Sequence, residues 1–209
     1  WTGAWNVSRM ISDAAAGCCL LQPQGEGVGI AAATFGRVQD YQVKDINNMG
    51  AAMAPAAAST LLHYFKDTGT EPQEFDCIYT GDLGQVGSQL LRELLAAEGL
   101  LIKNHVDCGC ILFDANEQSV KSGGSGPGCC AAVLCGHILP RLLRRSQKRV
   151  LFVATGALMS QTTFLQKESI PAVATISPEK LLFARIVYSL ENLITLRSIV
   201  RHDYDVGLC

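Results

Sequence analysis

The fold is decided by one stretch, Asp76-Cys-Ile-Tyr-Thr-Gly-Asp-Leu-Gly-Gln-Val-Gly-Ser88, which predicts a strand, a glycine-rich turn and the start of a helix. A second copy of the pattern, Ser122-Gly-Gly-Ser-Gly-Pro-Gly-Cys-Cys-Ala131, opens a helical stretch that leads to an apolar strand at 150–155. Glycine turns at helix starts expose backbone N–H groups and the positive end of the helix dipole, which favours an anion. Two such units predict a layered α/β domain whose helix starts converge on one ligand site.

The composition favours one domain, or a domain with an appendage, in a chain of 209 residues. Hydrophobic residues make up 48% and charged residues 17%, which is enough for a core, and a formal net charge of −2 argues against a nucleic-acid partner. No apolar run approaches the ~20 residues that a membrane span needs. The chain begins at Trp1 without a signal-like segment, so we expect a processed or partial gene product.

Nine cysteines are a high and odd number. Two adjacent pairs, Cys18-Cys19 and Cys129-Cys130, and the tight Cys108-Gly-Cys110 do not match the usual C-x-x-C spacing of zinc sites. We therefore expect thiols buried as small hydrophobic groups in a reducing cytoplasm, and no metal site.

The remaining elements follow from periodicity and turn residues. We expect strands at 14–21 and 28–34 joined by a hairpin-like turn, helices at 50–66, 86–97 and 129–144, a loop running into a strand at 105–113, and a last strand at 172–176. Beyond Leu181 the apolar spacing still fits a helix, but interrupting charges leave an unrelated appendage or a shifted reading frame equally open.

Seven segments in continuous order resemble the stage V sporulation protein AD family, a thiolase-fold family of endospore-forming bacteria. They are Thr34-Phe-Gly-Arg-Val38, Asn48-Met-Gly-Ala-Ala-Met-Ala-Pro-Ala-Ala-Ala58, Thr80-Gly-Asp-Leu-Gly84 with Val86-Gly-Ser88, His105-Val-Asp-Cys-Gly109, Gly123-Gly-Ser-Gly126, Val153-Ala-Thr-Gly-Ala-Leu158 and Gln166-Lys-Glu-Ser-Ile-Pro171. The resemblance implies an α/β fold: a thiolase-like C-terminal half-domain over 14–177, with a layered mixed β-sheet and helices. It leaves 1–13 as a divergent N-terminal remnant and 178–209 as a divergent tail with a helical pattern.

The resemblance also implies a function. Family members bind dipicolinic acid and assist its uptake, with calcium, into the developing spore, alongside membrane proteins of the same sporulation operon. The implied location is peripheral, at the cytoplasmic face of the inner spore (forespore) membrane. No cofactor is implied beyond calcium as a counter-ion of the ligand. A half sheet with an uncovered apolar face further predicts a homodimer or aggregation.

The alternative is a thiolase-superfamily acyltransferase or condensing enzyme. Such enzymes need a thiolate nucleophile and polarising groups, commonly a His at one helix start and an Asn or His at the next. Matching the elements by order puts Gly81 at the first position and Ser125 near the second. Neither a glycine there nor the adjacent Asp82 donates to an oxyanion at neutral pH, so we expect a binding protein without catalytic residues.

The candidate ligand-binding residues lie at the two glycine turns and in the segment between them. N–H groups around Gly124, Ser125, Gly126 and Cys129 could hold a carboxylate, although the glycines could equally serve tight packing. Asp82 would repel a dicarboxylate unless calcium lay between them, and its ordinary role at a helix start is an N-cap.

A second group of candidates surrounds a cysteine. His105 and Asp107 flank Cys108, which resembles a nucleophile–base arrangement but also fits a loop tied down by local polar contacts. A basic cluster at the end of the helix over 129–144 favours complementing the helix dipole, with docking to anionic lipid as the alternative. Its members are Arg141, Arg144, Arg145, Lys148 and Arg149.

Overall fold

Strand β5 (Cys77–Thr80) is buried along its whole length and faces two cores. Ile78 joins one apolar cluster, whereas Cys77 and Tyr79 join another on the opposite side. Because successive side chains of a strand point to opposite faces, a strand of this kind must be covered on both sides. The computed structural model, which describes residues 10–12, 15–22, 27–114, 118, 120–182 and 194–198, confirms the layered mixed sheet with helices.

The main sheet has the order β2-β10-β3-β9-β8-β5-β6, with β4 also paired to β9. Its strands besides β5 are β2 (Cys19–Gln22), β3 (Gly27–Ile30), β4 (Thr34–Phe35), β6 (His105–Asp107), β8 (Arg149–Ala157), β9 (Ala172–Leu182) and β10 (Ile194–Ser198). Strands β6, β5 and β8 are parallel, and β9 runs antiparallel to β8. A separate parallel pair joins β1 (Ile11–Ser12) to β7 (Gly124–Ser125). The carboxyl ends of the three parallel strands therefore meet at one edge of the sheet.

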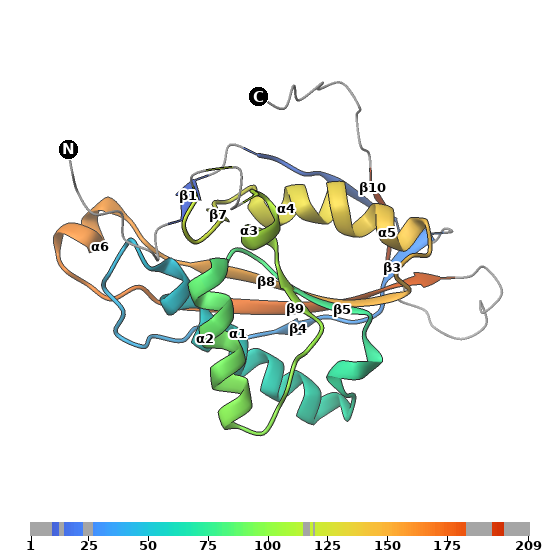
Figure 1. The fold of residues 1–209 in the computed structure, drawn as a ribbon, viewed down its shortest axis with the longest axis horizontal. Helices are drawn as coiled ribbons and strands as arrows, with labels where there is room; N and C mark the ends of the chain where they lie inside the picture. Colours follow the sequence, from blue (N-terminus) through green and yellow to red (C-terminus); the bar gives the residue numbers. More distant parts are fainter. Residues whose placement is uncertain are drawn as a thin grey trace.

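Helices cover both faces of this sheet (Figure 1). One face carries α1 (Met49–Thr68) and α2 (Gly84–Ala97), and the other carries α4 (Cys129–Val133) and α5 (Leu139–Leu143), which a π-helical turn (Leu134–Ile138) joins. Short helices are α3 (Cys108–Ile111), α6 (Gln161–Leu165) and a 3-10 turn at Pro72–Glu74. None of the helices in the described part is both long and apolar enough to cross a membrane.

The first half of helix α1 is rich in small residues, and the helix packs in the core from Gly50 to Leu61, whereas its last turn is exposed. Asn48 caps its start by accepting the N–H of Ala51, and Gly69, at φ 64°, ends it in the left-handed conformation. Where α1 crosses α2, a Cβ on Gly50 or Gly87 would lie within about 3 Å of the other glycine. The two helices therefore touch backbone to backbone, and α2 is held at a defined height over the sheet.

Three expectations about the elements are wrong. Strands β2 and β3 do not form a hairpin, because β10 pairs with both and lies between them. The segment from His105 begins with strand β6 and continues into α3, the reverse of a loop running into a strand. The helical pattern from 182 to 194 is contradicted at both ends, since Leu182 ends β9 and Ile194 begins β10. The residues between them, like 1–9 and 199–209, lie outside the described residues.

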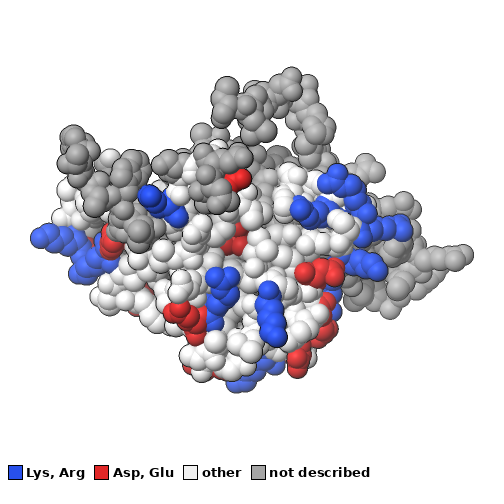
Figure 2. Space-filling view, in the orientation of Figure 1, with Lys and Arg blue, Asp and Glu red and all other residues white. Residues whose placement is uncertain are grey.

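The basic cluster lies at the α5 end of the molecule, where Lys and Arg side chains gather (Figure 2). Arg141 sits in the last turn of α5, where a cation complements the helix dipole. Arg149 donates to the carboxylate of Glu74 at 2.9 Å and lies over the ring of Phe75 at 4.4 Å from its centroid. These contacts give two of the cluster's side chains a local role in the fold.

Candidate functional site

The central group of the site is the carboxylate of Asp107, which is 2% exposed. It accepts the hydroxyl of Thr80 at 2.7 Å and the backbone N–H groups of Leu83 and Gly84, each at 2.9 Å. It also accepts the N–H of Cys110 at 3.2 Å, so it caps α3 as well. One side chain thus satisfies the starts of two helices, a role that the sequence alone does not reveal.

The start of α2 has no N–H left for an external anion. Asp107 takes the N–H groups of Leu83 and Gly84, and Ser122 takes the next two. The backbone carbonyl of Ser122 accepts the N–H of Gln85 at 2.8 Å, and the Ser122 hydroxyl accepts the N–H of Val86 at 3.4 Å. The first glycine turn therefore holds an anion as its sequence indicates, but that anion belongs to the protein itself.

Burial is the largest influence on the pKa values of both Asp107 and His105. It raises the pKa of Asp107 to about 6, against the opposing effect of the hydrogen bonds from Thr80, Gly84 and Leu83. Burial also lowers the pKa of His105 to about 4, with a smaller contribution from the positive charge of Arg92. At neutral pH the site therefore contains an ionised carboxylate and a neutral imidazole.

The hydrogen bonds determine the tautomer of that imidazole. Thr80 Oγ1 lies 2.9 Å from His105 Nε2 and gives its single hydrogen to Asp107 Oδ2. The imidazole must therefore donate from Nε2, which leaves Nδ1 as an acceptor. Nδ1 is buried and has no hydrogen-bond partner in the part of the chain that the structure describes.

Asp82 forms a second polar group, which we call the Asp82 cluster: Asp82, Ser125, Gly126 and Thr155. Its Oδ2 accepts the hydroxyl of Ser125 at 2.6 Å and the N–H of Gly126 at 3.2 Å, and its Oδ1 accepts the hydroxyl of Thr155 at 3.1 Å. Its own N–H donates to Thr155 Oγ1. The two glycine turns thus meet through this carboxylate. The N-cap interpretation of Asp82 is wrong, because no side chain caps α2 from its N-cap position.

The cysteines near the site are not arranged as nucleophiles. Among the described residues, no hydrogen bond joins the thiol of Cys108 to His105 or Asp107, and Cys108 packs in the apolar cluster with Cys129. Burial raises the pKa of Cys108 far above its usual range, and it raises that of Cys110 to about 12, in both cases with help from Asp107. The thiol of Cys129 lies 4.0 Å from the carbonyl of Gly124. Cys108 and Cys110 are therefore protonated thiols at neutral pH.

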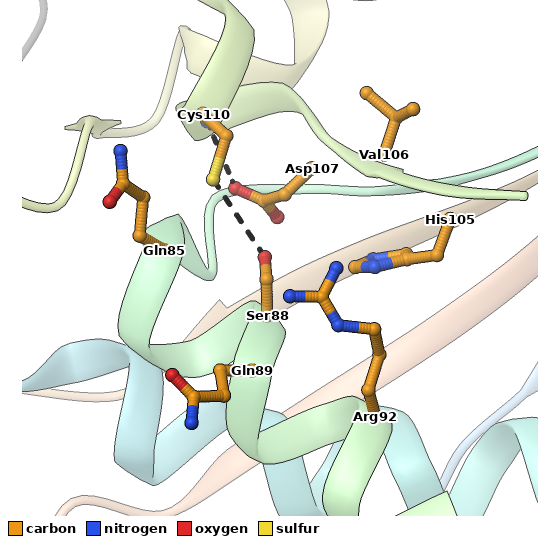
Figure 3. Close-up of a pocket in the computed structure, with 8 residues that line it drawn as sticks. All are labelled: Gln85, Ser88, Gln89, Arg92, His105, Val106, Asp107 and Cys110. Carbon is orange, nitrogen blue, oxygen red and sulfur yellow. Dashed lines mark hydrogen bonds between the residues drawn. The ribbon is translucent and has the colours of Figure 1, made fainter. Parts of the chain in front are cut away.

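A cavity of about 420 Å³ opens beside the Asp107 group, between α2, β6 and α3 (Figure 3). Strand β6 is the edge strand of the sheet and contributes His105, Val106 and Asp107. The opposite wall is a polar stripe of α2 at positions 85, 88, 89 and 92, with Cys110 of α3 at one end. The cavity combines two of the sequence-predicted residues with a helix face that was not predicted.

Three side chains of these polar groups and the cavity were not predicted, and the sequence carries a signal for each. Thr80 and Thr155 lie in neighbouring parallel strands, and such side chains come together at one sheet edge. Arg92 belongs to a polar stripe with Gln85, Ser88 and Gln89, whose spacing of three and four residues marks one face of a helix.

The described residues contain no group of three or more His, Cys, Asp or Glu side chains that could hold a metal ion. None of the eight cysteines in the described ranges forms a disulfide. The site is therefore built from hydrogen bonds between carboxylates, hydroxyls and backbone N–H groups.

This arrangement defines a mixed α/β domain whose two glycine turns are joined by a carboxylate. The family model described as Stage V sporulation protein AD (SpoVAD) matches residues 6–177. The chain belongs to this family, as its sequence motifs indicate. Stage V sporulation protein AD of Bacillus subtilis (strain 168) is 40% identical over 159 residues, which cover 76% of this chain and 47% of that protein. The chain thus spans about half the length of this curated relative.

Two solved structures are similar at lower levels. One is AbyA1, a tetronic acid condensing enzyme, at 15% identity and a TM-score of 0.38, covering 77% of this chain and 46% of that one. The other is the priming β-ketosynthase of the R1128 polyketide biosynthetic pathway, at 12% identity and a TM-score of 0.34, covering 75% of this chain and 52% of that one.

Proposed function

We propose that this chain is part of a sporulation protein that binds dipicolinic acid and, with calcium, assists its uptake into the developing spore, without catalysing a reaction. The observation that carries the proposal is the carboxylate seated on the second glycine turn. Ser125 and Gly126 hold the Asp82 side chain there at 2.6 and 3.2 Å. The turn is therefore built for a carboxylate, and dipicolinic acid offers two.

A ligand carboxylate reaches these donors in one of two ways. It displaces Asp82 from the turn, or it shares the donors with Asp82 through a calcium ion, which prefers carboxylate oxygens. Calcium removes the repulsion between the two carboxylates that would otherwise weaken binding. The calcium-bridged arrangement is the one we propose, in agreement with the implied role of calcium as counter-ion.

The binding role is supported over an acyl-transfer role by the environment of the helix starts. A Cβ on Gly81 would lie 2.3 Å from Thr155 Oγ1, so a catalytic His does not fit at this position without rearrangement. The thiol of Cys108 is buried and protonated at neutral pH, and the thiol of Cys129 is buried. Consequently we expect an acyl-CoA analogue to label neither Cys108 nor Cys129 in the folded chain; rapid labelling of either would favour the condensing-enzyme alternative.

Calorimetric titration of the chain with dipicolinic acid, with and without calcium, tests the proposal. We expect saturable binding that calcium strengthens. Replacing Ser125 by Ala removes one charge-assisted hydrogen bond and should weaken binding about tenfold. Asp82→Asn should abolish the effect of calcium while leaving calcium-free binding in place.

The matched control is Asp67→Asn, an exposed carboxylate in the last turn of α1 that takes no part in the Asp82 cluster. It should bind dipicolinic acid as the unchanged chain does. If the folded chain binds no dipicolinic acid with or without calcium, the proposal is wrong for this chain. The companion proposals, peripheral location at the cytoplasmic face of the forespore membrane and contact with membrane proteins of the operon, rest on family membership and are tested by fractionation of sporulating cells.

A further inference from the structure

Two thiols that are far apart in the chain lie beside each other at the layer formed by α4 and the π-helical turn. Cys19 is the first residue of β2, Cys135 belongs to the π-helical turn, and their sulfurs are 3.5 Å apart. Both side chains are half-buried, so a small reagent reaches them from solvent. A disulfide of about 2.05 Å between them needs only a small movement of the two side chains.

The backbone around the two thiols holds them in this position. A Cβ on Gly17 would collide with the carbonyl of Ala131 in α4 and would lie 3.0 Å from Cys135 Sγ. A Cβ on Gly128 would collide in the same way with the carbonyl of Ala15. The segment that leads into β2 therefore touches α4 backbone to backbone at two points, which residues without a side chain allow. The approach of the two thiols follows from this packing.

The other cysteines of this region are less well placed for a reaction with each other. Three thiols of the apolar cluster are buried, where a reagent from solvent does not reach them: Cys77, Cys108 and Cys129. Cys18 is exposed, but the contact of Cys135 Sγ with this residue is to its carbonyl oxygen, at 3.9 Å. The geometry thus favours one pair of thiols.

We propose that Cys19 and Cys135 form an oxidation site, at which a small-molecule disulfide converts the two thiols reversibly into a bond that clamps β2 onto the helical layer. One thiol attacks the reagent as a thiolate, forms a mixed disulfide and releases one molecule of the reagent's thiol. The second thiol attacks the protein sulfur of that mixed disulfide and releases the other molecule. Both protein sulfurs are oxidised, the reagent is reduced, and the two protons end on the released thiols.

The bond restrains one end of the main sheet. Strand β2 is the terminal strand in the order of that sheet and pairs with β10. The two cysteines are 116 residues apart, so the bond closes a long loop and removes many conformations from the unfolded chain. It also opposes local opening of β2 in the folded chain. The inference involves neither Asp82 nor its donors and does not depend on the proposed function.

The test uses oxidised glutathione as the disulfide reagent and the whole, reduced chain. After oxidation the remaining thiols are alkylated, and tryptic peptides are mapped by mass spectrometry without reduction. We expect a link between the peptide that contains Cys18 and Cys19 and the peptide that contains Cys129, Cys130 and Cys135. Dithiothreitol should remove this link. A chain unfolded in urea should give a mixture of links, because the folded packing no longer selects one pair.

Four variants assign the link to its two sulfurs, since each peptide contains more than one cysteine. Cys19→Ser and Cys135→Ser should each lose it. The matched controls Cys18→Ser and Cys130→Ser, which remove the neighbouring thiols of the same two peptides, should each retain it. Serine is close to cysteine in size, and far-UV circular dichroism of the reduced variants verifies that they fold.

Two further measurements report the clamp itself. The oxidised chain should unfold at a temperature roughly 10 °C higher than the reduced chain. The amide hydrogens of β2 should exchange more slowly after oxidation. In Cys135→Ser the same treatment should change neither quantity.

Three results would overturn the inference. The first is the absence of an intramolecular link in the folded chain even in oxidised glutathione alone. The second is a link that Cys19→Ser or Cys135→Ser retains. The third is a link that leaves the unfolding temperature and the exchange of β2 unchanged.

Discussion

Asp82 and Asp107 both lie near the start of α2, but they hold different groups of the protein. Asp82 is half-buried and joins a turn to a strand, largely through hydroxyl groups that water could replace. Asp107 is buried and holds three backbone N–H groups that have no other acceptor. The comparison shows that the role of a carboxylate at a helix start depends on the donors around it and on how deeply it is buried.

The largest expected effect is on Asp107. Replacing it by Ala leaves three backbone N–H groups and the hydroxyl of Thr80 without their acceptor in a buried site. We expect a loss of about 3–5 kcal/mol in the free energy of unfolding, measured by urea denaturation. Asp82→Ala should cost about 1–2 kcal/mol, because its donors can turn to water. Equal losses for the two variants would contradict the distinction.

The second prediction concerns pH. The pKa of Asp107 is raised to about 6, so between its unfolded value near 3.8 and about 6 the folded chain holds a proton that the unfolded chain has lost. Raising the pH through this window lowers the free energy of unfolding. The pKa of His105 is lowered to about 4, so between about 4 and 6.5 the unfolded chain holds the extra proton, and raising the pH raises the free energy of unfolding.

The two effects oppose each other between about pH 4 and 6, so the unchanged chain should show little pH dependence from this pair. Single variants separate them. In His105→Gln, stability should fall as the pH rises from 4 to 6, by up to about 1.4 kcal/mol per pH unit, and in Asp107→Asn it should rise. Urea denaturation at half-unit steps measures both slopes. Slopes of the same sign in the two variants would show that the groups do not titrate as described.

The smallest expected effect is that of Asp82→Asn on stability. Asn keeps an oxygen that accepts from Ser125, so we expect a change within about 1 kcal/mol, although the same variant should alter calcium-dependent ligand binding. Thermal unfolding with and without calcium checks this. A large loss of stability in this variant would make Asp82 a structural residue like Asp107 and remove the basis for proposing that a ligand reaches its donors.

The elements that were predicted correctly are those determined by local sequence. The strand at Asp76–Thr80 and the helix after it follow from glycine, apolar spacing and length, all within one short stretch. The pairing of β10 between β2 and β3 joins segments more than 160 residues apart in the chain, and no local pattern reports such a contact. The residues of the tail after β9 fit a helical pattern because a short apolar run has no single period.

The site was predictable to the level of its segments. The meeting of Asp82 with Ser125 follows from two glycine turns at one sheet edge. The sequence could not predict that Asp107 accepts the N–H groups at two helix starts while Asp82 joins the second glycine turn to β8. These roles depend on which donors each carboxylate reaches after packing. The polar stripe of α2 that contains Arg92 is visible in the sequence, but such a stripe is ordinarily exposed to solvent. Only the structure shows that this stripe lines a cavity.

The contact between Gly50 and Gly87 has a consequence for affinity. It fixes α2 against α1 from behind, while Asp107 fixes its first turn, so the wall of the cavity is in place before any molecule arrives. A molecule that entered the cavity would therefore order little of the backbone. The conformational entropy lost on binding should therefore be small, and a few well-placed polar contacts would suffice for recognition.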